Sequence, residues 1–128
     1  MRAPSMETLI QEIRTRAAEC LANTSSSHDW DHTLRVHKLC MQIGKAEGAD
    51  TDILQMAAYL HDIGRPFQDR SRGRVCHAER GAEIARTLLA PYPFPEEKKD
   101  NVLHCIRSHR FRGNHHPRTL EARVLFDA

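Results

Sequence analysis

The stretch Tyr59-Leu60-His61-Asp62-Ile63-Gly64 decides how this sequence is interpreted. An imidazole and a carboxylate stand side by side here, where an apolar helical pattern reaches a glycine that predicts its end. Neutral nitrogen and anionic oxygen together suit divalent ions such as Mn, Fe, Zn or Co. The stretch therefore predicts a metal-binding centre at the end of a helix.

The position of Asp62 adds a physical argument for this interpretation. A carboxylate near the C-terminal end of a helix is unfavourable, by roughly 0.3–1 kcal/mol at an exposed site, and a bound cation would remove that penalty. The alternative is a buried His61 beside an aspartate that contacts solvent.

Size and composition indicate a single domain covering residues 1–128, with 40% apolar and only 5% aromatic residues. The formal net charge of +2 is too small to favour nucleic acid as a partner. Apolar runs stay well short of the roughly 18 residues of a membrane span, so no membrane partner is expected. The four cysteines form no C-x-x-C pair, which argues against a zinc ribbon and favours a reduced, cytoplasmic protein.

The periodicity of apolar residues is helical throughout, and it predicts an all-α fold. A polar loop is expected over 65–75, where Pro66 and Gly73 interrupt the pattern. The expected helices begin at Ser5, run over 29–47 up to Gly48, run from the cap Asp50 to Gly64, cover 77–89, begin at Pro95, and begin at the cap Thr119.

The position of His32 on its expected helix places it near His61. His32 lies one turn before Val36 and extends the apolar stripe that includes Leu39 and Cys40. The short loop 48–50 makes this helix and the next antiparallel neighbours, so His32 and His61 are expected at the same level.

His104 and His109 lie on different faces of the helix that is expected to begin at Pro95. His109 shares a helix face with Val102 and Ile106, whereas His104 points away from both.

Five motifs in order now connect the chain to a known family. They are His28-Asp29-x-x-His32-x-x-Arg35-Val36, then Leu60-His61-Asp62-Ile63-Gly64, His77 ahead of Gly81 and Ala82, Ile106-Arg107-Ser108-His109, and Glu121 to Ala128. Over roughly residues 20–128 the chain resembles the HD-domain metal-dependent phosphohydrolase superfamily, in particular its small bacterial hydrolases. The resemblance implies a compact helical bundle of about five to six helices.

The resemblance also implies a ligand set. One divalent ion (Mn, Fe, Co, Mg, Ni or Zn) would be held by His32, His61, Asp62 and a terminal aspartate, and in two-metal relatives His77 and His109 contribute as well. An N-terminal cap or a substrate contact is the alternative for His77. Relatives continue as D-A-D, with the second aspartate as ligand. This sequence ends one residue before it, so either Asp127 takes that role or the domain is cut short at its C-terminal end.

The implied reaction is hydrolysis of a phosphoester, of a nucleotide or another small phosphorylated metabolite, by a metal-activated water. His61 and Asp62 would be the catalytic residues, and His28 and Asp29 would cap the helix and orient His32. Substrate phosphate is expected to contact Arg35, Arg65, Arg72 and Arg74, although a solvated charged loop is the alternative for the last three.

Two other functions stay open. HD folds with two irons held by six ligands carry out oxygen-dependent oxidation, and His77 with His109 would permit this. A degenerate module that binds a ligand without turnover is the third possibility. A dimer is compatible with the sequence.

Overall fold

The computed structural model describes residues 4–22, 29–72, 76–110 and 116–128, and every regular element in these ranges is a helix. This confirms the all-α prediction. The helices are α1 (Met6–Leu21), α2 (Asp29–Glu47), α3 (Thr51–Leu60), α4 (Arg65–Arg70), α5 (His77–Leu89), α6 (Glu96–Ser108) and α7 (Leu120–Asp127). None of them combines the length and the apolar character that crossing a membrane requires.

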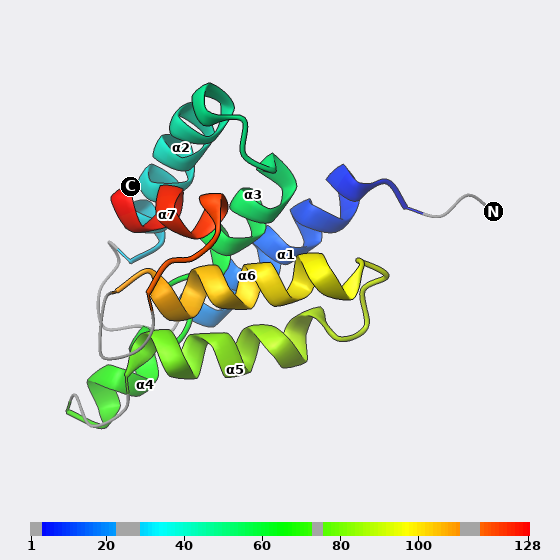
Figure 1. Cartoon of the computed structure of the whole chain (residues 1–128). Coiled ribbons are helices and arrows are strands. Elements are labelled where there is room, and N and C mark those ends of the chain that lie inside the picture. Colours follow the sequence, from blue (N-terminus) through cyan, green and yellow to red (C-terminus); the bar gives the residue numbers. More distant parts are fainter. Residues whose placement is uncertain (1–3, 23–28, 73–75, 111–115) are drawn as a thin grey trace.

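Helix α3 is the centre of the bundle, and it packs against α1, α2, α6 and α7 (Figure 1). Its residues from Ile53 to Leu60 are buried on every side except at Gln55. A helix that is apolar all round belongs in the interior. The residues directly after α3 therefore also lie inside the protein, and His61 and Asp62 are buried for this reason.

The predicted starts of α1, α3 and α7 and the predicted end of α2 follow from capping chemistry, whereas α3 ends at Leu60 and does not continue to Gly64. The Ser5 hydroxyl accepts a hydrogen bond from Thr8 N–H, Asp50 accepts from the amides of Asp52 and Ile53, and the Thr119 hydroxyl accepts from Ala122 N–H. Each cap satisfies amides that have no partner in the first turn of a helix. Gly48 has a φ of 77°, which is the left-handed conformation that ends α2 as expected.

The expected polar loop over 65–75 is wrong in its first half, because α4 occupies Arg65–Arg70 and raises the number of helices among the described residues to seven. Pro66 does not interrupt the helical pattern, because proline is tolerated in the first turn of a helix. Phe67 anchors this turn. The guanidinium groups of Arg70 and of Arg80 on α5 lie 4.6 and 4.8 Å from the centre of its ring.

One residue of the predicted inward stripe on α2 is misplaced. The buried positions of this helix are Thr33, Val36, Cys40 and Gly44, whereas Leu39 is 44% exposed. The buried face of α2 is narrow, with one buried residue at each turn, because α2 packs mainly against α3. Leu39 lies at the edge of this face.

Gly64 and Gly81 make a close backbone crossing between the end of α3 and α5. A Cβ on Gly64 would overlap the carbonyl oxygen of His77 and lie 2.5 Å from the amide nitrogen of Gly81. The absence of a side chain at Gly64 thus allows the start of α5 to approach Asp62.

Candidate metal centre

Asp62 is the centre of the site, and its side chain is only 3% exposed. It lies in the turn between α3 and α4, two residues after the last residue of α3. Its two carboxylate oxygens face different groups of side chains. This division gives the site two halves.

The first half contains His32 and His61. The Nε2 atoms of both histidines lie 3.6 Å from Oδ2 of Asp62. Their rings are 5.7 Å apart between centroids, which confirms the predicted meeting of His32 and His61 at one level. His61 is buried, whereas the His32 side chain is 49% exposed and opens this half to solvent.

The second half contains His77, the first residue of α5, and His109, the residue after α6. Their Nε2 atoms lie 3.3 and 3.8 Å from Oδ1 of Asp62 and 3.1 Å from each other. The antiparallel arrangement of α5 and α6 brings the start of one beside the end of the other (Figure 1).

The chemistry of these donor atoms fits a cation. Nδ1 of His61 donates a hydrogen bond of 2.6 Å to the carbonyl of Ala58, and Nδ1 of His109 donates one of the same length to the carbonyl of Ile106. Their Nε2 atoms therefore present lone pairs to a carboxylate that also presents lone pairs. Such backbone bonds are typical of histidines that bind a metal, and a cation between the acceptors would remove their repulsion.

In each half the three ligand atoms lie within 4.8 Å of one another, and Asp62 belongs to both halves. The site can therefore hold one divalent ion, or two ions bridged by one carboxylate.

Arg65 adds a permanent positive charge next to this centre. Its Nη2 lies 3.7 Å from Oδ1 of Asp62, and its side chain is 34% exposed. Burial raises the pKa of Asp62, but the neighbouring His61 and Arg65 lower it by more, so the carboxyl pKa lies below its ordinary value. Asp62 is thus an anion at neutral pH.

His61, His77 and His109 are neutral at the same pH. Burial lowers the pKa of His61, lowers that of His77 to about 4 and lowers that of His109 to about 3; for His77 and His109 it outweighs the attraction of Asp62. Neutral imidazole is the form that binds metals.

These pKa values predict how the metal-free protein responds to acid. A histidine whose pKa is lower in the folded state than its ordinary 6.5 contributes its full stability above pH 6.5 and loses it as the pH falls. For His77, protonation is expected to lower the free energy of unfolding by up to about 3 kcal/mol between roughly pH 6.5 and pH 4. Urea unfolding at a series of pH values measures this change.

A flatter pH dependence is expected for His77→Gln, whereas His116→Gln, at an exposed position, should follow the unmodified protein. An unfolding free energy that stays constant from neutral pH to about pH 4 would contradict the predicted burial of neutral imidazoles.

The remaining predicted residues are not brought into the centre. Asp127 is exposed at the end of α7 and belongs to neither half. Arg35 and Arg72 are exposed, and Asp29 begins α2, where its carbonyl accepts a hydrogen bond from Thr33. Two predicted residues, His28 and Arg74, lie outside the described residues.

His104 points away as expected, since its Nε2 accepts a hydrogen bond from the amide of Arg118.

Sequence reasoning missed the role of Arg110 and of two backbone carbonyls. Nη1 of Arg110 lies 3.3 Å from Nδ1 of His77, on the side of the ring away from Asp62. In the sequence, only the position of Arg110 directly after His109 indicates that its side chain lies near the centre. The carbonyls of Ala58 and Ile106, three residues before His61 and His109, are fixed by the last helical turn in each case.

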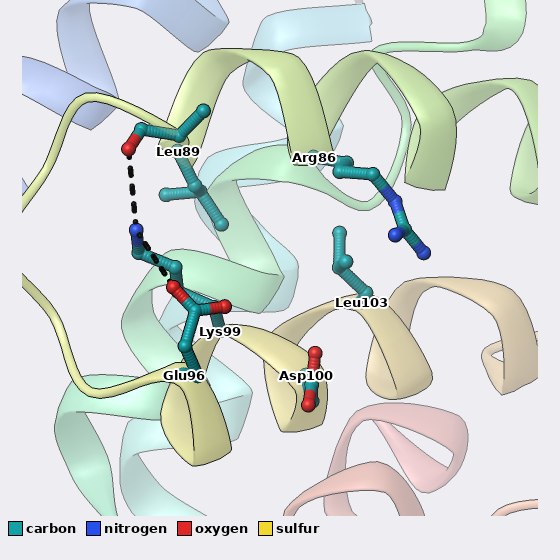
Figure 2. A pocket seen from close by; sticks show the side chains of 7 residues that line it. Arg86, Leu89, Glu96, Lys99, Asp100 and Leu103 are labelled. Carbon is teal, nitrogen blue, oxygen red and sulfur yellow. Dashed lines mark hydrogen bonds and ion pairs between the residues drawn. The ribbon is translucent and has the colours of Figure 1, made fainter.

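A separate cavity of about 170 Å³ lies at the opposite end of the α5–α6 pair (Figure 2). Lys99 closes one wall by bonding the Ala90 carbonyl at 3.3 Å and pairing with Glu96 at 3.6 Å. Leu89, another lining residue, lies 12 residues beyond His77, or roughly 18 Å along α5 at about 1.5 Å per residue. This cavity contains no histidine and is not part of the metal centre.

Several known proteins resemble this chain. The uncharacterized protein YpgQ of Bacillus subtilis is 32% identical over 123 residues, which are 92% of this chain and 57% of YpgQ. The crystal structure of a predicted HD superfamily hydrolase from an uncultured Thermotogales bacterium matches with a TM-score of 0.80 and 35% identity, over 91% of this chain and 64% of that one. Ribonuclease Y of Chloroflexus aurantiacus is 32% identical over 97 residues, 76% of this chain and 17% of the enzyme.

The chain thus spans somewhat more than half the length of YpgQ and of the Thermotogales protein. The family model described as HD domain matches residues 29–128, from the start of α2 to the last residue. This match contains every histidine and the aspartate of the two halves described above. The chain belongs to the HD domain family.

Proposed function

We propose that the protein is a metal-dependent phosphohydrolase acting on a small phosphorylated molecule, such as a nucleotide or another phosphorylated metabolite. The observation that carries this proposal is the buried carboxylate of Asp62, whose two oxygens face two separate pairs of histidines. Imidazole and carboxylate ligands suit Mn, Fe, Co, Ni and Zn better than Mg, which prefers oxygen alone.

A bound divalent ion would supply an activated water as nucleophile and would polarise a phosphoryl oxygen. The charge of Asp62 would hold that ion, and the neutral ring of His61 would direct a lone pair at it. The hydrogen bonds from His61 to the Ala58 carbonyl and from His109 to the Ile106 carbonyl hold these rings with Nε2 towards Asp62, so the rings need not rotate when an ion binds.

The exposed side of the centre indicates where a substrate would approach. His77 is fully buried and His61 nearly so, while His32 and Arg65 are 49% and 34% exposed. A phosphate arriving from the side of α2 and α4 would meet the guanidinium group of Arg65, which can bind two phosphate oxygens at once.

Substitution of Arg65 tests this approach. Arg65→Met should raise KM for the phosphorylated substrate by about 10- to 100-fold, because a hydrogen bond to a charged group is worth about 1.5–3 kcal/mol. Arg65→Lys keeps the charge but not the paired donors, so an intermediate KM is expected. Steady-state kinetics measure both effects, and an unchanged KM in Arg65→Met would exclude contact with the substrate.

Metal analysis combined with a substrate panel tests the function itself. The protein is loaded with each candidate metal and assayed against nucleotides, sugar phosphates and a short RNA, the last because one relative is a ribonuclease. Metal-dependent release of phosphate or nucleoside supports the proposal. His61→Ala should abolish both metal retention and turnover while the helical circular dichroism remains.

Other outcomes would point to other functions. Two bound irons with substrate-dependent oxygen uptake would indicate an oxygenase, and the absence of any retained metal would indicate a module that binds without turnover. We place the activity in the cytoplasm, because all four cysteines are free thiols and suit a reducing compartment.

A further inference from the structure

The hydrogen bond between Arg110 and His77 fixes where the proton of His77 lies. Nη1 of Arg110 is 3.3 Å from Nδ1 of His77. A guanidinium group has only N–H donors, so Nδ1 must be the acceptor. A neutral imidazole carries its single hydrogen on the other nitrogen, and for His77 this is Nε2, the atom that faces Asp62 and His109.

His109 has the opposite arrangement. Its Nδ1 is 2.6 Å from the carbonyl of Ile106, which can only accept, so the hydrogen of His109 is on Nδ1. Its Nε2 then accepts a hydrogen bond, and His77 Nε2 at 3.1 Å can donate it. The four groups form one directional chain, from Arg110 to His77 to His109 to the Ile106 carbonyl.

The two halves of the centre therefore differ in the lone pairs that they offer to a metal ion. A metal ligand must offer a lone pair, and His61 does so through Nε2, whereas the Nε2 lone pair of His109 accepts the hydrogen of His77. His77 presents an N–H bond at the same place. For His77 to bind an ion, its hydrogen would have to move to Nδ1, where it would face the N–H group of Arg110.

We propose that Arg110 is a positioning residue that holds His77 as a hydrogen-bond donor and so restricts tight metal binding to the His32–His61 half. The inference rests on the proposed metal-dependent function and adds to it the number of ions that bind tightly. An ion in the His77–His109 half would also lie close to the positive charge of Arg110, which opposes its binding further.

Nitrogen-15 NMR of labelled histidines in the full-length, metal-free protein reads the tautomers directly. We expect the Nε2–H form for His77 and the Nδ1–H form for His61 and His109 at neutral pH. The Nδ1–H form of His77 in the unmodified protein would overturn the inference. This measurement requires neither metal nor substrate, so its result is independent of whether the protein is a phosphohydrolase.

Two variants test the consequence for metal binding. Arg110→Met has no donor, so His77 should shift towards the Nδ1–H form. The second equivalent of Mn²⁺ should then bind more tightly by about 10- to 100-fold, the usual effect of a partner of a metal-binding histidine. Arg110→Lys keeps a donor and should behave like the unmodified protein.

Calorimetric titration with Mn²⁺ gives the two affinities. Equal, tight binding of two ions by the unmodified protein would refute the inference while leaving the proposed hydrolase intact. An unchanged second affinity in folded Arg110→Met would refute it as well.

Discussion

Asp62→Asn is expected to remove the metal from the centre and to lower turnover by a factor of about 10³, the upper range for the loss of one essential electrostatic group. Asparagine keeps the shape of the side chain but lacks the negative charge. Its amide also places an N–H donor where an oxygen now faces a pair of histidines. Metal content per chain and kcat on the substrate identified by the panel measure the two effects.

The matched control is Asp100→Asn, the same exchange at an exposed position of α6. This variant should retain metal and turnover. The helical content of both proteins should equal that of the unmodified chain, because the exchange conserves the size and shape of the side chain at both positions. Full metal content and full turnover in Asp62→Asn would exclude Asp62 as a metal ligand and remove the basis of the proposed mechanism.

The second large effect concerns stability. Gly64→Ala is expected to lower the free energy of unfolding by about 3 kcal/mol or more, at the upper end for overpacking. The new methyl group would overlap the backbone of His77 and Gly81, and backbone cannot move aside as a flexible side chain does. Denaturant unfolding measures the loss.

Gly81→Ala is the control for this change, because it adds the same methyl group on the other side of the same crossing. Its Cβ would lie 3.3 Å from the nitrogen of Gly64 and 3.6 Å from a methyl of Ile106, so only small adjustments are needed. Alanine is also favoured over glycine inside a helix by about 1 kcal/mol. A loss of stability in Gly81→Ala equal to that in Gly64→Ala would contradict the predicted asymmetry.

Local patterns were sufficient to predict much of the fold and part of the site. The proximity of His32 and His61 followed from an apolar stripe and from the loop of three residues that joins their helices. The orientation of His109 followed from its spacing to Ile106. The caps Ser5, Asp50 and Thr119 act as their side-chain chemistry predicts. All these features depend on neighbours close in the sequence.

Features that depend on distant neighbours could not be predicted in the same way. The helix over Arg65–Arg70 is stabilised by Arg80 on α5, which contacts Phe67 only in the folded chain. The contact of Arg110 with His77 likewise depends on the crossing of α5 and α6.

The assignment of Asp127 shows the limit of motif spacing. The motif placed an aspartate near the end of the chain, but the orientation of α7 leaves its side chain exposed.

The proposed tight half takes His32 from α2 and His61 and Asp62 from the turn that follows α3, so an ion bound there would link these two parts of the bundle. Binding to the folded chain alone adds RT ln(1 + [L]/Kd) to its stability, about 2.7 kcal/mol when the free ion is at 100 times Kd. Resistance of the protein to heat and proteolysis would thus rise with the logarithm of the available metal. In a cell short of that metal, the protein would be degraded faster, so its abundance would follow the supply of its own cofactor.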